Sequence, residues 1–353
     1  MPLTQINGGM LDSVAQQVGF RNRIINGSMA IDQRNAGASV TIAQGAAAFT
    51  VDRWQVGNFR SIAGNLTFQQ SSIVPANFRS SLLLTNGVAG ANAAGDAVFL
   101  QQPIEGFNVA DLGWGTADAQ PVTISFWVRS SVTGTYGVSV RGTDRSYISS
   151  VVISQANTYE YKTITIPAIT TGTWNTTNAA GITLLFDLGI GTNNSQSGGS
   201  WQNTSNYGLT GGTKWYLTSG ATFYITGVQL EKGSTATSFD YRPYGTELQL
   251  CQRYFQPVLS ATGAASATAS LNLSVSYNSM RTDTPTFITP SGFITVTDWY
   301  ATNTNTSSQP TWIVNTQSGN NSNIRTANIS GLTVARPYGL SGGTGYIYAQ
   351  AEL

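Results

Sequence analysis

The sequence predicts an all-β protein, and three observations support that prediction. Charged residues make up only 9% of the 353 residues, and 38 residues are glycine. The remaining polarity comes from Asn, Gln, Ser, Thr and Gly, which are poor helix formers and good turn formers. Short runs of alternating apolar and polar residues recur at the spacing typical of a β-sandwich. Nothing in the pattern suggests strands alternating with helices.

The length allows two domains with buried cores, so no disulfide or metal is needed to explain folding. We expect an arm over residues 1–19 that packs on a partner or a neighbouring subunit. A jelly roll, meaning two packed antiparallel sheets, should follow over 20–243. A linker helix over 244–257 would then lead to a smaller β-sandwich over 258–353.

The composition also excludes several classes of function. The chain has no histidine, which removes Ser-His-Asp and Cys-His catalysis and every zinc site built on imidazole. A formal net charge of +1 with scattered Lys and Arg argues against nucleic-acid binding. The first residues lack the pattern of a signal peptide, and no window resembles a membrane span. We therefore expect a soluble protein that is made in the cytoplasm.

The strand signal begins at Phe20, with Ile24 and Ile25 before a turn at Asn26-Gly27 and alternating apolar residues after it. This dipeptide lies between alternating apolar residues, which is typical of a hairpin or a sharp turn. Gly, Asn or Pro then separates nearly all of the strand-like runs. The predicted strands of this part are 39–42, 50–56, 66–70, 81–84 and 97–104.

The run PVTISFWVRSS gives the clearest alternation. Every second residue from Val122 to Val128 is apolar and should face a core, which places Trp127 and Arg129 on the opposite face. GITLLFDLGIG repeats the pattern, and TYGVSVRG and EYKTITIP supply two further strands. Trp127 is therefore the sharpest candidate for an exposed aromatic side chain. The alternative is that the arm, a loop or a neighbouring subunit covers it.

Residues 191–213 are polar and rich in glycine, which predicts a long loop. Loops of this length inside compact domains are usually functional or disordered. The loop carries Trp201 and Tyr207, and Trp174 and Trp215 flank it. These aromatic residues either form an exposed binding surface or pack over the end of the sandwich.

The segment 221–257 joins the two β-regions. Its apolar alternation changes parity at Thr226-Gly227, which predicts a β-bulge. Thr246 precedes Gln249 by three residues, as in a capping box, and indicates a helix from Thr246 to Gln256. We expect the helix face formed by Leu248, Cys251 and Phe255 to contact another subunit. Cys251, the single cysteine, should be a buried thiol.

From residue 258 onward, six or so further strands are expected, and the last runs to the C-terminus. Trp299 and Tyr300 lie in this second β-region and are candidates for a distal aromatic patch. Flat aromatic faces stack on sugar rings while neighbouring polar groups bond the hydroxyls. The candidate carbohydrate-binding residues are Trp127, Arg129, Trp174, Trp201, Tyr207, Trp215, Trp299 and Tyr300.

Several motifs together resemble a widespread group of bacteriophage and prophage virion proteins that includes tail fibre and minor structural proteins. The motifs are NRIINGSMAIDQRN, TVDRW, QPVTISFWVRSS and FYITGVQLEKGSTATSFDYRPYGTELQLCQRYF. In that group the first domain is similar to a carbohydrate-binding-module jelly roll. The resemblance implies a place on the virion, a homotrimer, and contact of the N-terminal arm with other virion proteins. Apart from the resemblance, no membrane insertion is expected, because no window of the sequence resembles a membrane span.

Carbohydrate-binding modules of this shape often carry an acidic pair near a structural calcium in the strand equivalent to FYITGVQLEKG. Thr226 and Gly227 occupy that place here, so the resemblance does not carry this calcium over. An alternative site would use Asn26, Asp52 and backbone carbonyls. We otherwise expect no cofactor, and no metal site is assigned.

The leading hypothesis is a non-enzymatic virion fibre or receptor-binding protein that displays β-domains to glycans on the host cell surface. A structural adaptor or decoration protein of the head or tail, without glycan binding, is the alternative. A glycan depolymerase would need two carboxylates facing each other in a groove. The sequence shows no repeat of the kind that a long β-helix requires, so catalysis is the weakest of the three hypotheses.

Overall fold

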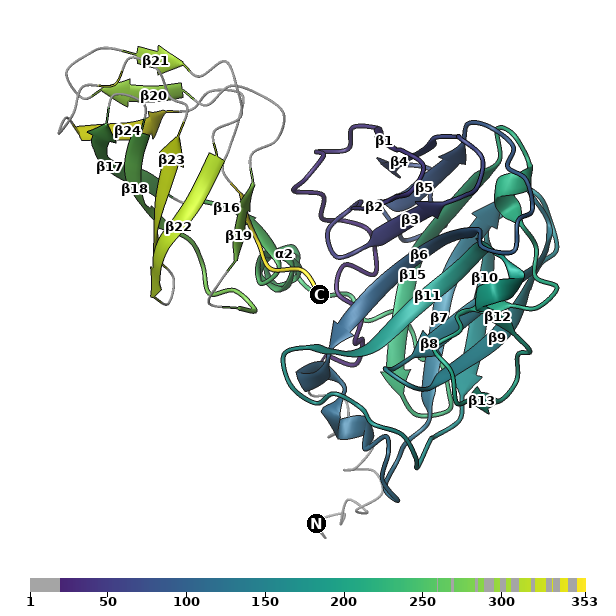
Figure 1. Ribbon diagram of the computed structural model, residues 1–353. Coiled ribbons are helices and arrows are strands. Elements are labelled where there is room, and N and C mark those ends of the chain that lie inside the picture. The colour runs from purple at the N-terminus through teal and green to yellow at the C-terminus, as the bar shows by residue number, and fades with distance from the viewer. Residues whose placement is uncertain are drawn as a thin grey trace, which may run out of the picture. The chain divides into compact units, whose positions relative to one another are not determined.

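The computed structural model describes residues 20–258, 260–267, 270–282, 285–288, 295–298, 303–305, 311–318, 321–327, 332, 337–341 and 348–353. They divide into two compact units, of which the first ends at Glu247 and the second runs from Leu248 to Glu352. Both are built almost entirely of β-strands, which confirms the all-β prediction (Figure 1). The arm predicted over residues 1–19 lies outside the described residues.

One layer of the first unit is a six-stranded antiparallel sheet, which we call sheet A. It contains the predicted strand with Trp127 next to the strand of the FYITGVQLEKG motif. The order in sheet A is β1 (Val40–Ile42), β4 (Leu66–Ser71), β5 (Ser81–Asn86), β15 (Thr222–Lys232), β7 (Val122–Ser130) and β10 (Glu160–Ile166).

The other layer is a seven-stranded sheet, which we call sheet B. Its order is β13 (Trp201–Gln202), β9 (Ser146–Ile153), β8 (Gly134–Arg141), β11 (Ala180–Ile190), β6 (Ala97–Glu105), β3 (Gln55–Phe59) and β2 (Ala46–Phe49). Short connecting elements accompany the two sheets. They are the 3₁₀ helices Gly106–Asn108, Ala110–Leu112, Thr192–Asn194 and Trp215–Leu217, and the parallel strands β12 (Ser195–Gln196) and β14 (Gly208–Leu209).

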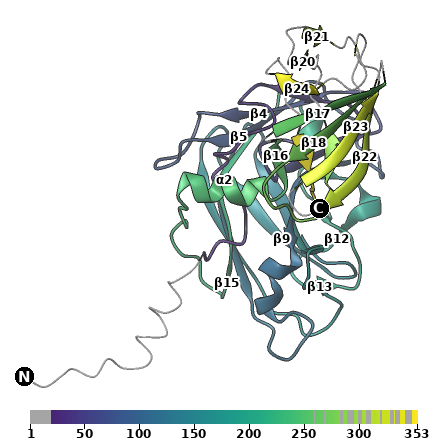
Figure 2. The same cartoon turned by 90° about the vertical axis from the view of Figure 1, so that its left-hand side faces the viewer.

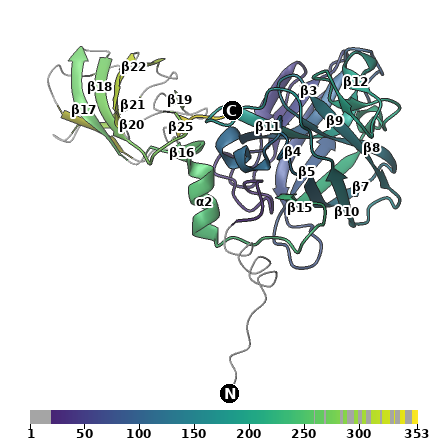
Figure 3. The same cartoon turned by 90° about the horizontal axis from the view of Figure 1, so that it is seen from below.

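The hydrophobic core of the first unit lies between sheets A and B. Figures 2 and 3 show the ribbon of these sheets from the left-hand side and from below. Phe126 of β7 and Phe186 of β11 meet in its centre, with ring centroids 5.0 Å apart. Removing such apolar side chains from water is the main force that holds the layers together. The arrangement confirms the predicted sandwich of two antiparallel sheets.

The β-bulge predicted at Thr226-Gly227 is confirmed. The register between β15 and β7 shifts between Thr226 and Gln229, and Gly227 has a φ of 63°. The turn predicted at Asn26-Gly27 is also present, with Asn26 at a φ of 58°. No strand flanks this turn among residues 20–39, so it is a sharp turn and not a hairpin.

The strand predicted over residues 50–56 begins only at Gln55, so the prediction is wrong for residues 50–54. Residues 51–53 form a turn between β2 and β3, in which the Trp54 amide donates to the Val51 carbonyl at 3.1 Å. Arg53 has a φ of 72°, a left-handed conformation that interrupts an extended strand. Asp52 and Arg53 are nevertheless buried.

The predicted helix is shorter than expected and begins earlier. Helix α2 spans Tyr244–Gln252, so Thr246 lies inside the helix and does not cap it. Residues 255–257 instead form strand β16, because Phe255 packs on Tyr348 with stacked rings 4.8 Å apart. Backbone pairing of β16 with the last strand therefore ends the helical path.

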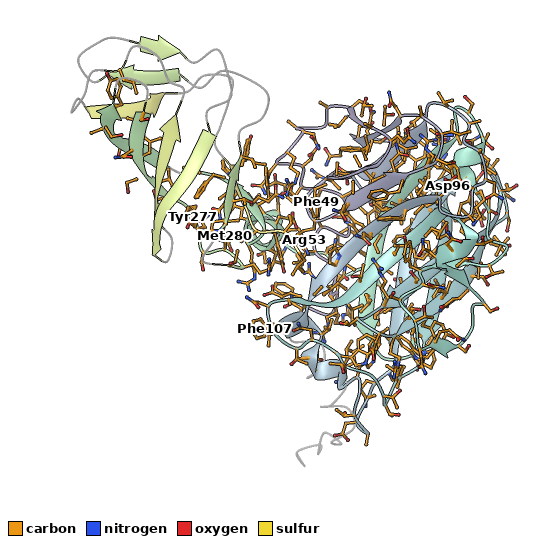
Figure 4. The ribbon with its side chains drawn as sticks, viewed as in Figure 1. Phe49, Arg53, Asp96, Phe107, Tyr277 and Met280 are labelled. Atoms are coloured by element: carbon orange, nitrogen blue, oxygen red, sulfur yellow. The ribbon has the colours of Figure 1, made fainter. Side chains whose placement is uncertain are left out.

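The second unit contains a three-stranded and a seven-stranded sheet. The first has the order β16 (Phe255–Pro257), β25 (Tyr348–Gln350) and β19 (Thr286–Ile288). The second has the order β21 (Asn303–Asn305), β20 (Thr295–Asp298), β24 (Pro337–Ser341), β17 (Ser260–Ala267), β18 (Ser270–Ser276), β23 (Asn321–Ala327) and β22 (Thr311–Ser318). Tyr277 and Met280, labelled in Figure 4, belong to the buried cluster of this unit.

The described part of the chain includes no helix with the length and apolar character needed to cross a membrane.

Candidate functional site

The outward face of sheet A brings together the side chains that sequence alternation assigned to an exposed surface. Along β7, Phe126 and Val128 are buried in the core, and Trp127 and Arg129 lie on the other face, half-buried. The register places Trp127 beside Thr226 of β15 and Tyr161 of β10. The faces predicted for this strand are therefore confirmed.

Trp127 and Tyr161 form a pair of aromatic rings on this face. Their ring centroids are 5.3 Å apart at an interplanar angle of 47°, and Tyr161 is 44% exposed. We call this pair the Trp127–Tyr161 platform. A sugar ring that presents an apolar face can stack on such a surface.

The indole N–H of Trp127 differs from those of the other tryptophans whose side chains the structure describes. Four of them donate to backbone carbonyls, and the fifth, Trp215, is completely buried. Trp127 has no acceptor among the described residues, and its indole nitrogen is not buried. The four that donate are Trp54, Trp114, Trp174 and Trp201. Trp127 therefore keeps a hydrogen-bond donor available beside its exposed ring.

Arg129 extends the platform along β7. Its guanidinium lies 4.9 Å from the Tyr224 ring centroid, and its Nε donates to the Asn157 carbonyl at 2.8 Å. None of the ion pairs among the described residues involves Arg129. The positive charge is therefore positioned by an aromatic ring and a carbonyl, without a carboxylate to neutralise it.

A pocket of about 350 Å³ opens beside the platform. The bulge at Gly227 connects the two, because a Cβ at this position would lie 2.6 Å from the Phe78 ring and 3.2 Å from Trp127. Phe78 belongs to the pocket wall. The lining residues are Asn22, Gly27, Ser28, Ala30, Asn77, Phe78, Arg79, Phe239, Asp240, Tyr241, Arg242, Tyr244 and Glu247.

Trp174 and Trp201 come together at one end of the sandwich, in a cluster with Trp114. Their ring centroids are 4.8 to 5.7 Å apart, and the rings meet edge to face. Trp114 is only 7% exposed, and all three indole N–H groups donate to backbone carbonyls. The cluster packs over the end of the sandwich. This is the alternative to an exposed binding surface that was considered for Trp201.

Tyr207 lies on the outward face of sheet B. Its ring contacts Phe99 at 5.9 Å and lies 4.8 Å from the Arg141 guanidinium. Burial lowers the pKa of Arg141, with the opposing influence of Tyr207 being smaller. The loop that carries Tyr207 is held on sheet B by Asp187, which accepts the amide of Leu209 at 2.9 Å. Tyr207 is therefore separate from the platform.

Three candidates from the sequence cannot be placed in a binding surface. Trp215 is 0% exposed, so its assignment as a binding residue is wrong; it begins a 3₁₀ helix and packs into the core between the sheets. Trp299 and Tyr300 lie outside the described residues, and their assignment stays a prediction.

The expected subunit contact is also largely used within the chain. Cys251 and Phe255 are buried, and Phe255 stacks on Tyr348 of the same unit. Leu248 alone of the three is half-buried. The buried thiol predicted for Cys251 is confirmed, but a shared apolar face of Leu248, Cys251 and Phe255 is not available to a neighbouring subunit.

The proposed calcium ligands Asn26 and Asp52 are engaged in hydrogen bonds. The Asn26 side-chain amide donates to the carbonyls of Ile31 and Asp52, at 2.8 and 2.9 Å, and its oxygen accepts from the Ile31 amide. The Asp52 carboxylate accepts from the backbone and side chain of Gln33. The NH₂ group of the Asn26 side chain therefore faces the carbonyls that a cation would need as ligands. These residues do not fit a calcium site, which requires oxygen ligands.

Sequence reasoning missed Tyr161 and the aromatic wall of the pocket. The alternation in EYKTITIP placed Tyr161 on one face of a strand, but only the register with β7 shows that this face is shared with Trp127. Phe78 comes from a segment far in the chain from Phe239 and Tyr241, and the three ring centroids lie 4.8 to 5.6 Å apart. No local pattern signals such an encounter.

No family model matches the chain, and no curated protein matches its sequence. Solved structures share its fold class at low similarity. A candidate sugar-binding protein from Bacteroides thetaiotaomicron has 11% identity and a TM-score of 0.35, covering 60% of this chain and 99% of that one. The family 11 carbohydrate-binding module from Clostridium thermocellum, in complex with a mixed-linked tetrasaccharide, has 9% identity and a TM-score of 0.25, with 60% and 95% covered.

A third similar structure is the enzymatically active domain of tailspike protein 4 of bacteriophage CBA120. It has 14% identity and a TM-score of 0.28, and the match covers 60% of this chain but only 21% of that one.

Proposed function

We propose that the chain is a non-enzymatic glycan-binding protein of a bacteriophage particle, which binds host-surface glycans through the outward face of sheet A. The observation that supports this proposal best is the Trp127–Tyr161 platform with its unpaired indole N–H. A stacked sugar ring would cover the two aromatic rings, and one of its hydroxyls would accept the Trp127 proton.

The virion role rests on the sequence resemblance to tail fibre and minor structural proteins. A single shallow platform gives weak binding, and a particle that displays several copies gains affinity because the sites engage one surface together. We therefore propose a homotrimeric fibre or receptor-binding protein. Sedimentation of the purified chain should give the mass of three copies, and a monomer at micromolar concentration would count against this part.

Binding to an array of immobilised bacterial surface glycans tests the proposed function. Trp127→Ala should weaken binding about tenfold or more for every glycan that the parent protein recognises, because it removes both the stacking surface and the donor. Phe107→Ala is the matched control, since Phe107 is 60% exposed and lies on the 3₁₀ helix after β6, outside sheet A (Figure 4). It should bind as the parent does.

Two results would contradict the proposal. One is equal binding by the Trp127→Ala variant and the parent protein, with both folded. The other is an absence of glycan binding together with specific binding to head or tail proteins, which would favour the structural adaptor or decoration role.

A further inference from the structure

The pocket beside the platform combines an aromatic wall with one unpaired positive charge. Phe78, Phe239 and Tyr241 pack against one another on the wall, and Tyr241 is 56% exposed. The Tyr241 hydroxyl donates to the Asn77 carbonyl at 2.8 Å, which fixes the ring at the pocket mouth. The pocket volume of about 350 Å³ lies within the range of small-molecule sites.

Three of the four charged side chains in the pocket lining already have partners within the first unit. Arg242 and Glu247 form an ion pair at 3.1 Å, with side chains only 3% and 11% exposed. The Asp240 carboxylate accepts the backbone amides of Arg21 and Asn22, at 2.9 and 3.3 Å. These contacts link the beginning of the first unit to its end and explain why the pocket walls stay in place.

Arg79 is the exception. It is exposed, it lines the pocket, and the structure shows no hydrogen bond or ion pair between its side chain and any described residue. An arginine fork matches the geometry of a carboxylate, which it can bind through two parallel hydrogen bonds. The pocket thus offers an unused anion-binding group next to aromatic rings.

Arg79 lies two residues before β5, close to the platform. Trp127 is the register partner of Thr226, whose hydroxyl donates to the carbonyl of Ser80 at 2.7 Å. Gly227, the next residue, lies between Trp127 and Phe78. A glycan stacked on the platform can therefore place its neighbouring ring in the pocket. Arg129, on the other side, adds a second positive charge without a carboxylate partner.

We infer that the pocket selects an acidic sugar, a uronate whose ring rests against the Phe78–Phe239–Tyr241 wall and whose carboxylate binds Arg79. This inference rests on the proposed function, because it names the class of glycan that the same face recognises. Neutral sugars bind the platform, and the carboxylate determines which glycan binds more tightly.

The test compares methyl glucuronide with methyl glucoside, which share the ring and differ in the carboxylate. Titrations followed by amide NMR of the full chain should give about tenfold tighter binding of the glucuronide, as expected for one charge-assisted hydrogen-bonded contact. Arg79→Gln should remove this preference, while Arg79→Lys should keep part of it. Arg141→Gln is the matched control, because it removes the same charge from sheet B.

The outcomes separate the two proposals. Equal affinity for both sugars, or a preference that survives in Arg79→Gln, overturns the acidic-sugar inference and leaves glycan binding in place. A preference lost equally in Arg141→Gln also overturns it, since overall charge would then be the cause. If neither sugar shifts any resonance of the platform or the pocket, the inference and the proposed function both fail.

Discussion

The first unit contains two groups of tryptophans that look alike in the sequence and differ in the structure. At one end of the sandwich, Trp114, Trp174 and Trp201 pack edge to face and give every indole N–H to a backbone carbonyl. On sheet A, Trp127 pairs with a single tyrosine and leaves its N–H without an acceptor among the described residues. A satisfied donor indicates packing, and an accessible unsatisfied donor beside an exposed ring indicates recognition.

The largest expected difference between the two groups is in stability. Trp114→Ala should lower the free energy of unfolding by about 4 kcal/mol, because it leaves a cavity in a buried cluster. Trp127→Ala should cost about 1 kcal/mol, since its ring is only half-buried. Urea denaturation of both variants measures this difference. Similar losses of unfolding free energy in the two variants would show that Trp127 is a core residue. The distinction between packing and recognition tryptophans would then fail.

A second prediction concerns Asp187, which fastens the loop of Trp201 and Tyr207 to sheet B. Its carboxylate accepts the amides of Gly189 and Leu209, and burial raises its pKa to about 6. Because the pKa is higher in the folded than in the unfolded state, the folded state binds the proton more tightly. The contribution of Asp187 to stability is therefore complete below the unfolded pKa near 4 and is lost as the pH rises through 6. The free energy of unfolding should fall by about 3 kcal/mol across this window because of Asp187.

Asp187→Asn cannot titrate and isolates this contribution. Asp32 shifts in the same direction, while Asp96 and Glu160 have lowered pKa values, so the parent curve alone is a mixture. The free energy of unfolding of the parent, minus that of the variant, should decrease as the pH rises from 4 to 7. If the difference in free energy of unfolding does not change with pH, the pKa of Asp187 is not raised by burial in the folded protein. Glycan binding by sheet A should stay unchanged in this variant.

The smallest effect is expected at the bulge between platform and pocket. Gly227→Ala should lower stability by about 1 to 2 kcal/mol, because a left-handed alanine is strained and its Cβ meets the Phe78 ring. Gly220→Ala is the matched control, since Gly220 has a φ of 71° and no atom near its Cβ position. The excess loss in Gly227→Ala, measured by thermal unfolding, reports the contact with Phe78. Equal losses of stability in the two variants would mean that Gly227 makes no tight contact with Phe78 and does not link the pocket to the platform.

The sequence predicts features that depend on one strand and misses those that depend on several. Alternation along β7 was enough to place Trp127 and Arg129 on the outward face, and the parity change at Gly227 was enough to predict the bulge. Trp215 was misjudged because its polar neighbours indicate a loop, whereas its ring reaches the core. The pocket depends on contacts between the beginning, middle and end of the unit, which no local pattern encodes.

The most direct test of glycan recognition at Trp127 is the indole region of an NMR spectrum recorded during addition of a glycan identified on the array. We predict that the Trp127 indole N–H resonance shifts with saturation, and that those of Trp114, Trp174 and Trp201 do not move. In the free protein, the Trp127 proton should also exchange with solvent faster than these three, because it lacks an acceptor among the described residues. Movement of the Trp174 and Trp201 resonances, with Trp127 unchanged, would contradict the account.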